Sequence, residues 1–285
     1  MKEEQNTMNK ITLYGFNNLT KNLSFSLYKL HYIHQHEHLA RYSDYINTHY
    51  NSKKLTTLLS DICHAIGGNV LNIANQDYQP HGASVTLMMS EEAQPEPLPS
   101  SIVNSALPQS LVAHLDKSHL CIHTYPDEIL ANKAESSLQA NNSQSANKGK
   151  VAIFRADIEL STCGVISPLK VLDYVINAFN ADVIDVDYRI RGMTRNLQGA
   201  MQFNDQDINQ ISDFLSPQLL SHYQVEDNSL IYKNLFHSRL CRKENSAINN
   251  IFAHQELDKL SSKEKENIST YLQDEMQQIF SNSTS

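Results

Sequence analysis

The chain has 285 residues, of which 40% are hydrophobic and 19% charged, and its formal net charge is −8. This composition is typical of a globular protein that buries a sizeable core, and the acidic balance argues against binding to nucleic acid through a basic surface. No apolar run approaches the roughly 18 residues that a membrane-spanning helix needs, so we expect no membrane partner and a cytoplasmic location. The 4 cysteines form no CxxC pair, which argues against a disulfide framework.

The first third of the chain is predicted to hold both strands and helices. Apolar and polar residues alternate within residues 11–33, which favours a strand, and shorter strands are expected over residues 70–74 and 83–89. Apolar residues from Leu55 to Ile66 recur at helical spacing and stop at a Gly-Gly pair, which predicts an amphipathic helix.

Three histidines lie at alternate positions, at His34, His36 and His38. On a strand this spacing would place three imidazoles on one face, as a metal site requires. The residues that follow are typical of a helix, so we interpret the triplet as the solvated start of a helix.

The middle of the chain holds one short strand between two irregular stretches. Residues 91–110 contain four prolines and are expected to form an extended surface connection, and residues 127–150 are expected to form a polar loop. Between them, residues 119–124 alternate as a half-buried strand. The alternation places His119, Cys121 and His123 on one face and puts Ser118 on the other, with Leu120 and Ile122.

The last part of the chain returns to interleaved strands and helices. Strands are predicted over residues 153–163 and 183–190, and a helix and a strand around residues 207–214 and 230–240. A helix capped by Ser167 should follow the first of these strands, and Ser261 with Glu264 forms a capping box for a last helix. Because the strands at 83–89 and 119–124 have no helix between them, we expect an α+β fold with a largely antiparallel sheet packed against helices.

Several motifs together resemble one family. The strongest are Pro80–Thr86, Ser118–Pro126 and Ala156–Gly164, with further likeness at Gly15–Lys21 and Asp187–Gly192. In this order they resemble the bacterial S-adenosylmethionine decarboxylase proenzymes, in the long form of that family. The resemblance implies a chain that cuts itself between Lys117 and Ser118 into residues 1–117 and 118–285, which stay interwoven in one domain as a two-chain protomer.

The resemblance also implies the cofactor and the site residues. The cofactor is a pyruvoyl group made from Ser118, which serves as the carbonyl electron sink that a decarboxylase needs. His123 corresponds to the base that removes the α-proton of Ser118 during self-processing, Ser84 to a serine that assists ester formation, and Cys163 to the proton donor of the decarboxylation cycle.

Other features implied by the resemblance concern the substrate and the assembly. The substrate is S-adenosylmethionine, whose decarboxylated form is the aminopropyl donor for spermidine synthesis, and cleaved chain pairs associate into an oligomer that Mg²⁺ activates. Tyr125 is a candidate to stack on the adenine ring, although it is equally a sheet aromatic. Asp127 stands where the family more often has Glu, which puts the role of that carboxylate in doubt.

A metal-dependent hydrolase or zinc-binding module is the alternative interpretation. Its ligands would be His114, His119, Cys121 and His123, of which the last three share a strand face. The chain has no HExxH motif, and ligands on one strand would still need a partner from another element.

Overall fold

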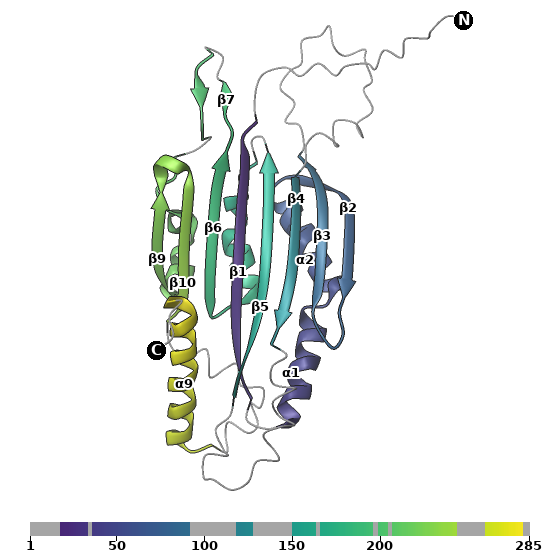
Figure 1. The fold of residues 1–285 in the computed structure, drawn as a ribbon, viewed down its shortest axis with the longest axis vertical. Helices are drawn as coiled ribbons and strands as arrows, with labels where there is room; N and C mark the ends of the chain where they lie inside the picture. The colour runs from purple at the N-terminus through teal and green to yellow at the C-terminus, as the bar shows by residue number, and fades with distance from the viewer. Residues whose placement is uncertain are drawn as a thin grey trace, which may run out of the picture.

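The protein is described by a computed structural model that covers residues 18–33, 36–91, 118–127, 150–163, 166–195, 199–204, 207–243 and 260–281. Its central feature is an 8-stranded sheet in the order β2-β3-β4-β5-β1-β6-β10-β9 (Figure 1). Every neighbouring pair in this sheet is antiparallel. The expected α+β fold with a largely antiparallel sheet is therefore confirmed.

The strands of this sheet are mostly longer than their sequence patterns indicated. Their bounds are β1 (Thr20–Ile33), β2 (Gly68–Asp77), β3 (Ala83–Glu91), β4 (Ser118–Pro126), β5 (Lys150–Cys163), β6 (Val183–Arg191), β9 (Tyr223–Leu230) and β10 (Leu235–Arg242). A separate 2-stranded sheet is formed by β7 (Thr194–Arg195) and β8 (Met201–Gln202).

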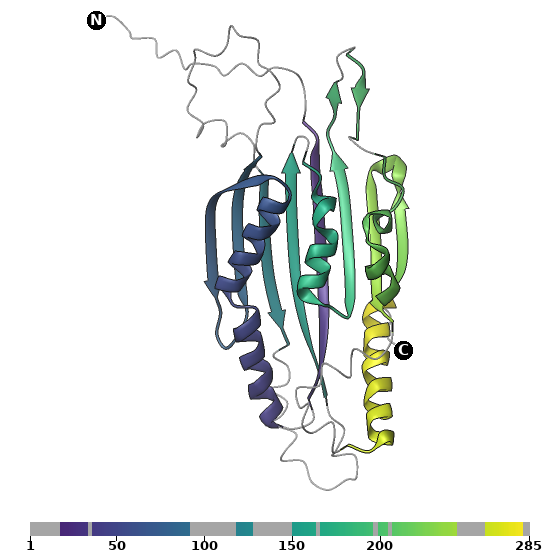
Figure 2. The same ribbon diagram turned by 180° about the vertical axis from the view of Figure 1, so that it is seen from behind.

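Helices cover the two faces of the large sheet unequally. The helices are α1 (His36–His49), α2 (Ser52–Ala65), α5 (Leu172–Phe179), α6 (Pro217–His222) and α9 (Ser262–Ser281), with 3-10 turns η1 (Pro168–Val171), η2 (Ile211–Phe214) and η3 (Ile231–Lys233). Seen from behind, α2 lies over β2, β3 and β4 at one end of the sheet, and α5 lies over the middle (Figure 2). We call this the helix face. None of the described helices combines the length and the apolarity needed to cross a membrane.

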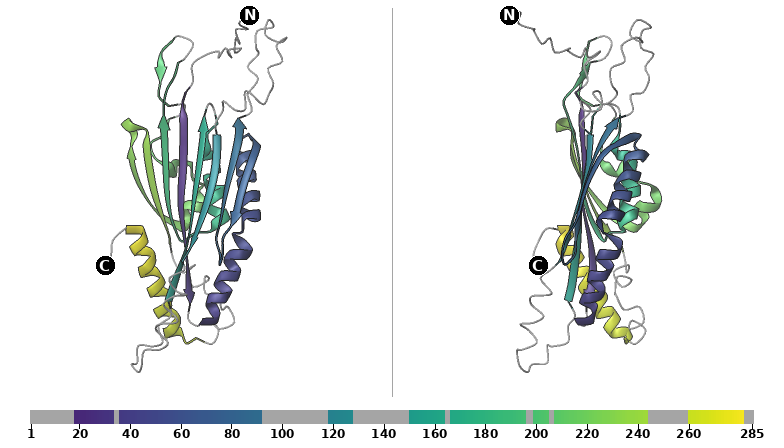
Figure 3. Two further views of the ribbon diagram at one scale, coloured as in Figure 1. Left: turned by 45° about the vertical axis from the view of Figure 1, so that its right-hand side comes forward. Right: turned by 90° about the vertical axis from the view of Figure 1, so that its right-hand side faces the viewer.

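Among the described residues, the opposite face of the sheet is covered only at one end. There α9 packs Leu272 and Met276 into a second apolar cluster with Leu30 and Cys241 (Figure 3). The remainder of this face carries polar side chains such as Asp157, and we call it the open face. Because antiparallel sheets tolerate one wet face, this arrangement needs no second layer for stability.

Strand β1 shows how the sequence produces the helix face. Its side chains alternate between half-buried and buried, with Leu23, Phe25 and Leu27 at most 2% exposed. Burying a side chain of this size contributes about 1.5–3 kcal/mol. The strand lies between β5 and β6 and pairs along its length with both. It therefore anchors the centre of the sheet.

Some sequence predictions were wrong in detail. The segment 207–214 forms only the 3-10 turn η2, and the single strand expected around 230–240 is two strands, β9 and β10, that are separated by η3. Ser167 makes no side-chain capping hydrogen bond, because the chain enters α5 through the 3-10 turn η1. A helix does begin at His36, but His38 is only 2% exposed, so its side chain is buried and not solvated.

Other expectations fall outside the described residues. They concern the first part of the strand expected within 11–33, the proline-rich connection after residue 91, and the loop between residues 128 and 149. The helix expected from Leu55 to Ile66 is confirmed as α2, and the capping box of α9 is formed by Ser261 and Glu264, whose side chains bond at 2.7 Å.

Candidate active site

The alternation predicted for β4 is confirmed. Ser118 is 1% exposed and Leu120 and Ile122 are 0% exposed, whereas His119 and His123 are exposed. Because successive side chains of a strand point to opposite faces, Ser118 belongs to the helix face and His123 to the open face. The two proposed processing residues therefore lie on different sides of one strand.

Ser118 and Cys163 are brought together at one end of the sheet. Ser118 is the first residue of β4 and Cys163 is the last residue of β5. The backbone N–H of Cys163 donates a hydrogen bond to the Ser118 hydroxyl oxygen at 3.2 Å. The half-buried Cys163 also pairs across the sheet with Thr20 of β1. The two residues thus meet at one strand end through the Cys163 backbone, where Ser118 is buried and Cys163 is half-buried.

His123 and Ser84 are brought together elsewhere. Ser84 on β3 is the direct cross-strand partner of His123, and Asp157 on β5 is its partner on the other side. The phenol of Tyr78 and the Ser84 hydroxyl are hydrogen-bonded at 2.7 Å. Directly opposed residues of an antiparallel pair share a face, with Cβ atoms about 4.5–5.5 Å apart. A serine, an imidazole and a carboxylate therefore stand in a row on the open face.

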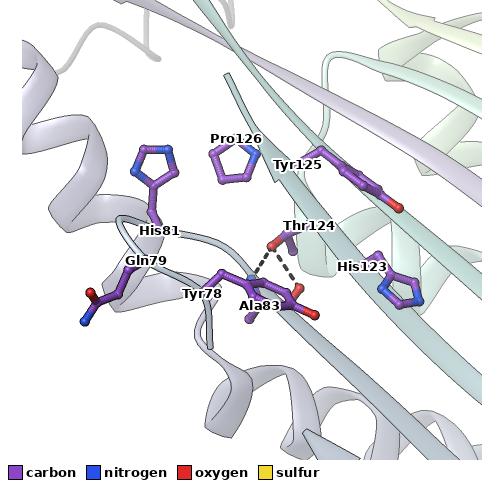
Figure 4. A pocket seen from close by; sticks show the side chains of 8 residues that line it. All are labelled: Tyr78, Gln79, His81, Ala83, His123, Thr124, Tyr125 and Pro126. Atoms are coloured by element: carbon purple, nitrogen blue, oxygen red, sulfur yellow. Dashed lines mark hydrogen bonds between the residues drawn. The ribbon is translucent and has the colours of Figure 1, made fainter. Parts of the chain in front are cut away.

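A pocket of about 400 Å³ opens beside this row (Figure 4). Its lining residues are Tyr78, Gln79, His81, Ala83, His123, Thr124, Tyr125 and Pro126. The turn before β3 shapes one wall, because the Tyr78 N–H donates to the Gly82 carbonyl at 2.8 Å. Gly82 has a φ of +107°, a backbone conformation that favours glycine. We call this site the His123 pocket.

The distance between Ser118 and His123 is the main geometric constraint on their proposed roles. Ser118 and His123 are five residues apart on a regular strand, which separates their Cα atoms by about 16 Å. Their side chains also leave opposite faces of β4. Within one copy of the chain, the imidazole of His123 cannot reach the Cα proton of Ser118.

Tyr125 and Asp127 have different surroundings. Tyr125 lines the pocket, is 47% exposed, and lies 4.4 Å from the guanidinium carbon of Arg155, measured to its ring centroid. Asp127 does not line the pocket, and its backbone N–H donates to the Ile153 carbonyl at 3.0 Å. Of these two residues, Tyr125 is the one with a ring at the pocket on which a planar ligand could stack.

The zinc interpretation finds no geometric support. Among the residues whose structure is described, no three His, Cys, Asp or Glu side chains gather so that they could hold a metal ion, and His114 lies outside that set. Burial, together with the nearby Glu159 carboxylate, raises the pKa of the Cys121 thiol, which disfavours the thiolate that zinc requires. All four cysteines are free, and burial raises the pKa of Cys63 and Cys241 to about 11.

Sequence reasoning missed two residues of the His123 pocket. Tyr78 lies in the turn between β2 and β3, a segment that offered no pattern, and the structure shows that its phenol is hydrogen-bonded to the Ser84 hydroxyl. Asp157 was part of a recognised motif without a role, and its carboxylate accepts a hydrogen bond from Ser26 at 2.9 Å. Lys117, on the other side of the expected cut, lies outside the described residues.

Comparison with known proteins points to a single family. No protein-family model matches the chain. The S-adenosylmethionine decarboxylase proenzyme of Hahella chejuensis is 42% identical over 272 residues, which cover 95% of this chain and 96% of the relative. That of Sodalis glossinidius is 42% identical over 274 residues, covering 96% and 97%. The solved adenosylmethionine decarboxylase of Aquifex aeolicus covers 63% of this chain and 96% of its own at 15% identity, and its TM-score of 0.34 is too low to support an inference. The full-length matches to the curated relatives show that the chain belongs to the S-adenosylmethionine decarboxylase proenzyme family.

Proposed function

We propose that the chain cuts itself between Lys117 and Ser118 and then decarboxylates S-adenosylmethionine. The observation that carries this proposal is the position of Ser118, a serine that is 1% exposed and begins a strand. A cut there leaves β3, which ends at Glu91, and β4 intact. Residues 1–117 supply β1, and residues 118–285 supply β5 and β6 on either side of it, so the pieces stay interwoven.

The residues around Ser118 suit the pyruvoyl group that the family implies. That group supplies a carbonyl electron sink for the electrons released when carbon dioxide leaves. The buried strand start excludes water from Ser118, and a dry site is needed if an ester at this position is to be eliminated and not hydrolysed. Cys163 ends the neighbouring strand and carries a thiol that can deliver a proton to the substrate carbon.

His123 and Ser84 suit the self-processing steps. An imidazole is the side chain whose ordinary pKa suits removal of a proton at neutral pH, and His123 is exposed enough to exchange protons with solvent. Ser84, which shares a hydrogen bond with Tyr78, can orient a hydroxyl toward a group that enters the pocket. Both roles require these residues to approach a Ser118.

We therefore infer that the active site combines two copies of the chain. Because His123 and Ser118 of one copy lie about 16 Å apart on opposite faces, the base for one copy must come from another. This inference supports an oligomer of cleaved chain pairs, with two copies as the minimum.

Co-expression of two differently tagged, inactive chains tests the shared site. A Ser118→Ala chain keeps His123, and a His123→Ala chain keeps Ser118. If the base is supplied by a partner, the His123→Ala chain is cut only when the Ser118→Ala chain is present. A His123→Ala chain that remains whole in the mixture, while wild type is cut, would contradict the two-copy site.

The primary test is intact mass measurement combined with release of labelled carbon dioxide. Cleavage should give pieces of 117 and 285 − 117 = 168 residues, the second with a carbonyl in place of its amino terminus. The purified protein should release carbon dioxide from carboxyl-labelled S-adenosylmethionine. An active enzyme that remains one 32.3 kDa chain would falsify the proposal.

Two finer proposals concern ligands. Tyr125 is proposed to stack on the adenine ring with the ring face that Arg155 leaves open, and Tyr125→Leu should then raise KM more than it lowers kcat. Activation by Mg²⁺ is proposed from the family resemblance alone. Dialysis against a chelator, followed by addition of Mg²⁺ or Ca²⁺, measures whether turnover depends on the cation.

A further inference from the structure

Arg155 lies at the centre of a group of side chains on the open face. On β5 it pairs directly with Tyr28 of β1 on one side and with Tyr125 of β4 on the other. Directly opposed residues of antiparallel strands share a face, so the side chain of Arg155 leaves the sheet between two tyrosines. Asp157, two residues further along β5, lies on the same face. The described residues that line the His123 pocket include Tyr125 but not Arg155.

The contacts of Arg155 join the pocket wall to the neighbouring part of the open face. Its guanidinium carbon lies 4.4 Å from the centroid of the Tyr125 ring, and its Nη2 lies 3.1 Å from Asp157 Oδ2. The other carboxylate oxygen of Asp157 accepts a hydrogen bond from Ser26 at 2.9 Å. Because Asp157 is held at both oxygens, it fixes the guanidinium while the flat face of that group lies over the Tyr125 ring.

Tyr28 restrains the guanidinium from the other side. Burial raises the pKa of the Tyr28 phenol, and the carboxylates of Asp185 and Asp157 raise it further. The charge of Arg155 and a hydrogen bond from its side chain act in the opposite direction, as expected of a guanidinium close to the phenol oxygen. Neighbours on three strands therefore fix the position of Arg155.

Stability alone does not account for this arrangement. The side chains of Arg155 and Asp157 are 39% and 30% exposed, and a partly exposed ion pair contributes little to folding. The Nε–H of Arg155 is buried and has no hydrogen-bond partner among the described residues, which costs stability. Such a cost is expected where a side chain is held in one orientation for function.

Arg239 provides an internal comparison. It also lies on the open face and binds a carboxylate, since its Nε donates to Asp185 at 2.8 Å. Its Nη1 donates to the Phe280 carbonyl at 2.6 Å, near the end of α9. Arg239 is thus explained by the docking of a helix, whereas the contacts of Arg155 lead to a tyrosine on the wall of a pocket.

We propose that Arg155 is a positioning residue that holds the Tyr125 ring so that its opposite face is presented to the adenine ring of the substrate. The inference rests on the proposed function, in which Tyr125 stacks on adenine. A ring that is already fixed loses less conformational freedom when the substrate binds, so Arg155 lowers KM without taking part in the chemistry. Asp157 balances the charge of Arg155, which would otherwise repel the cationic sulfonium group of S-adenosylmethionine.

Steady-state kinetics of the purified, self-processed enzyme tests the proposal through a double-mutant cycle. The variants are Arg155→Met, Tyr125→Leu, the double variant and the matched control Arg189→Met, which changes an exposed arginine on the open face of β6. Arg155→Met should raise KM about three- to tenfold, the size expected of a cation–π contact, and leave kcat within about twofold. In the Tyr125→Leu background the same change should raise KM less than about twofold, because the ring through which Arg155 acts is gone. Arg189→Met should keep the wild-type KM.

The results separate this inference from the proposed function. Equal increases in KM with and without the Tyr125 ring, or an unchanged KM in either single variant, would overturn the role of Arg155. A fall in kcat at constant KM would overturn it as well. If Arg155→Met does not fold, as judged by circular dichroism, Arg155→Gln takes its place in the cycle and decides in the same way. A wild-type chain that stays whole, or that releases no carbon dioxide from S-adenosylmethionine, would contradict the proposed function itself.

Discussion

The two groups of site residues differ in almost every physical respect. At the start of β4, Ser118 is buried, faces the helices, and is held by a backbone hydrogen bond from Cys163. In the His123 pocket, the imidazole is exposed, faces the open side of the sheet, and has polar cross-strand neighbours in Ser84 and Asp157. One strand, β4, carries Ser118 and His123, the central residue of each group.

This difference matches two different chemical demands. A bond that must be broken without water needs a dry site, and the buried end of β4 provides it. A base that takes up and releases protons needs access to solvent, and the open face provides that. Because one copy of the chain cannot satisfy both demands at one point, the separation favours a site assembled from two copies.

The largest expected effect comes from removing the imidazole. His123→Ala should slow elimination about 10²–10⁴-fold, because a general base typically contributes that much. The serine hydroxyl remains, so the chain should stall as an ester that hydroxylamine cuts. His119→Ala is the matched control, since His119 lies on the same exposed face of the same strand. Equal processing of the two variants would remove His123 from the mechanism.

The second effect separates processing from turnover. Cys163→Ala removes the thiol but keeps the backbone N–H that bonds to Ser118, so the chain should still be cut. Decarboxylation should fall about 100-fold or end in early inactivation, because the substrate carbon lacks its proton donor. Cys121→Ala, which changes another half-buried thiol, should keep full turnover. Lasting turnover by Cys163→Ala would assign the proton donor elsewhere.

The third effect tests a residue that the sequence did not single out. Tyr78→Phe removes the hydroxyl that bonds to Ser84 at 2.7 Å. Losing a hydrogen bond of about 1 kcal/mol should slow processing roughly fivefold, measured as the rate of chain cleavage. Tyr174→Phe is the control, because the Tyr174 hydroxyl also has one hydrogen bond, to Asp61, at a remote exposed site. If the two variants are cut at the same rate, the Tyr78 hydroxyl does not position Ser84 for processing.

The sequence predicted the sheet better than it predicted the site. Alternation correctly assigned the faces of β4, because burial of one face imposes a period of two on any half-covered strand. Strand order and register are long-range properties, and the 14-residue strand β1 lies between β5 and β6, which follow it by more than a hundred residues. No local pattern contains that information.

The same limit explains which site residues were missed. Asp157 becomes a neighbour of His123 only through the β4–β5 register. Tyr78 reaches Ser84 across the short turn between β2 and β3, through a side-chain hydrogen bond that no alternation pattern indicates. Motif resemblance named Ser118, His123 and Cys163, yet it gave no indication that two of them lie on opposite faces.

The smallest expected effect concerns a pair of residues on the open face, away from Ser118 and from the His123 pocket. His237 and Asp187 are cross-strand partners joined at 2.8 Å, and the hydrogen bond that the Asp187 carboxylate accepts raises the pKa of His237 above its usual value. A raised pKa in the folded state means that the pair stabilises the fold fully at pH values below about 6.5, and that this contribution fades as the pH rises through the raised value. Asp185 also raises the pKa, whereas Arg239 opposes the effect.

Asp187→Asn should therefore lower the free energy of unfolding more at pH 5.5 than at pH 9. Both side chains are partly exposed, at 30% for His237 and 54% for Asp187, so solvent screening limits the difference to about 0.5 kcal/mol. Urea unfolding at the two pH values measures it, and His237→Gln should give the same pH dependence because it removes the same pair. Because this pair lies outside both groups of site residues, chain cleavage should be unchanged in Asp187→Asn. A larger loss at pH 9 than at pH 5.5 would show that the protonated pair does not stabilise this part of the open face.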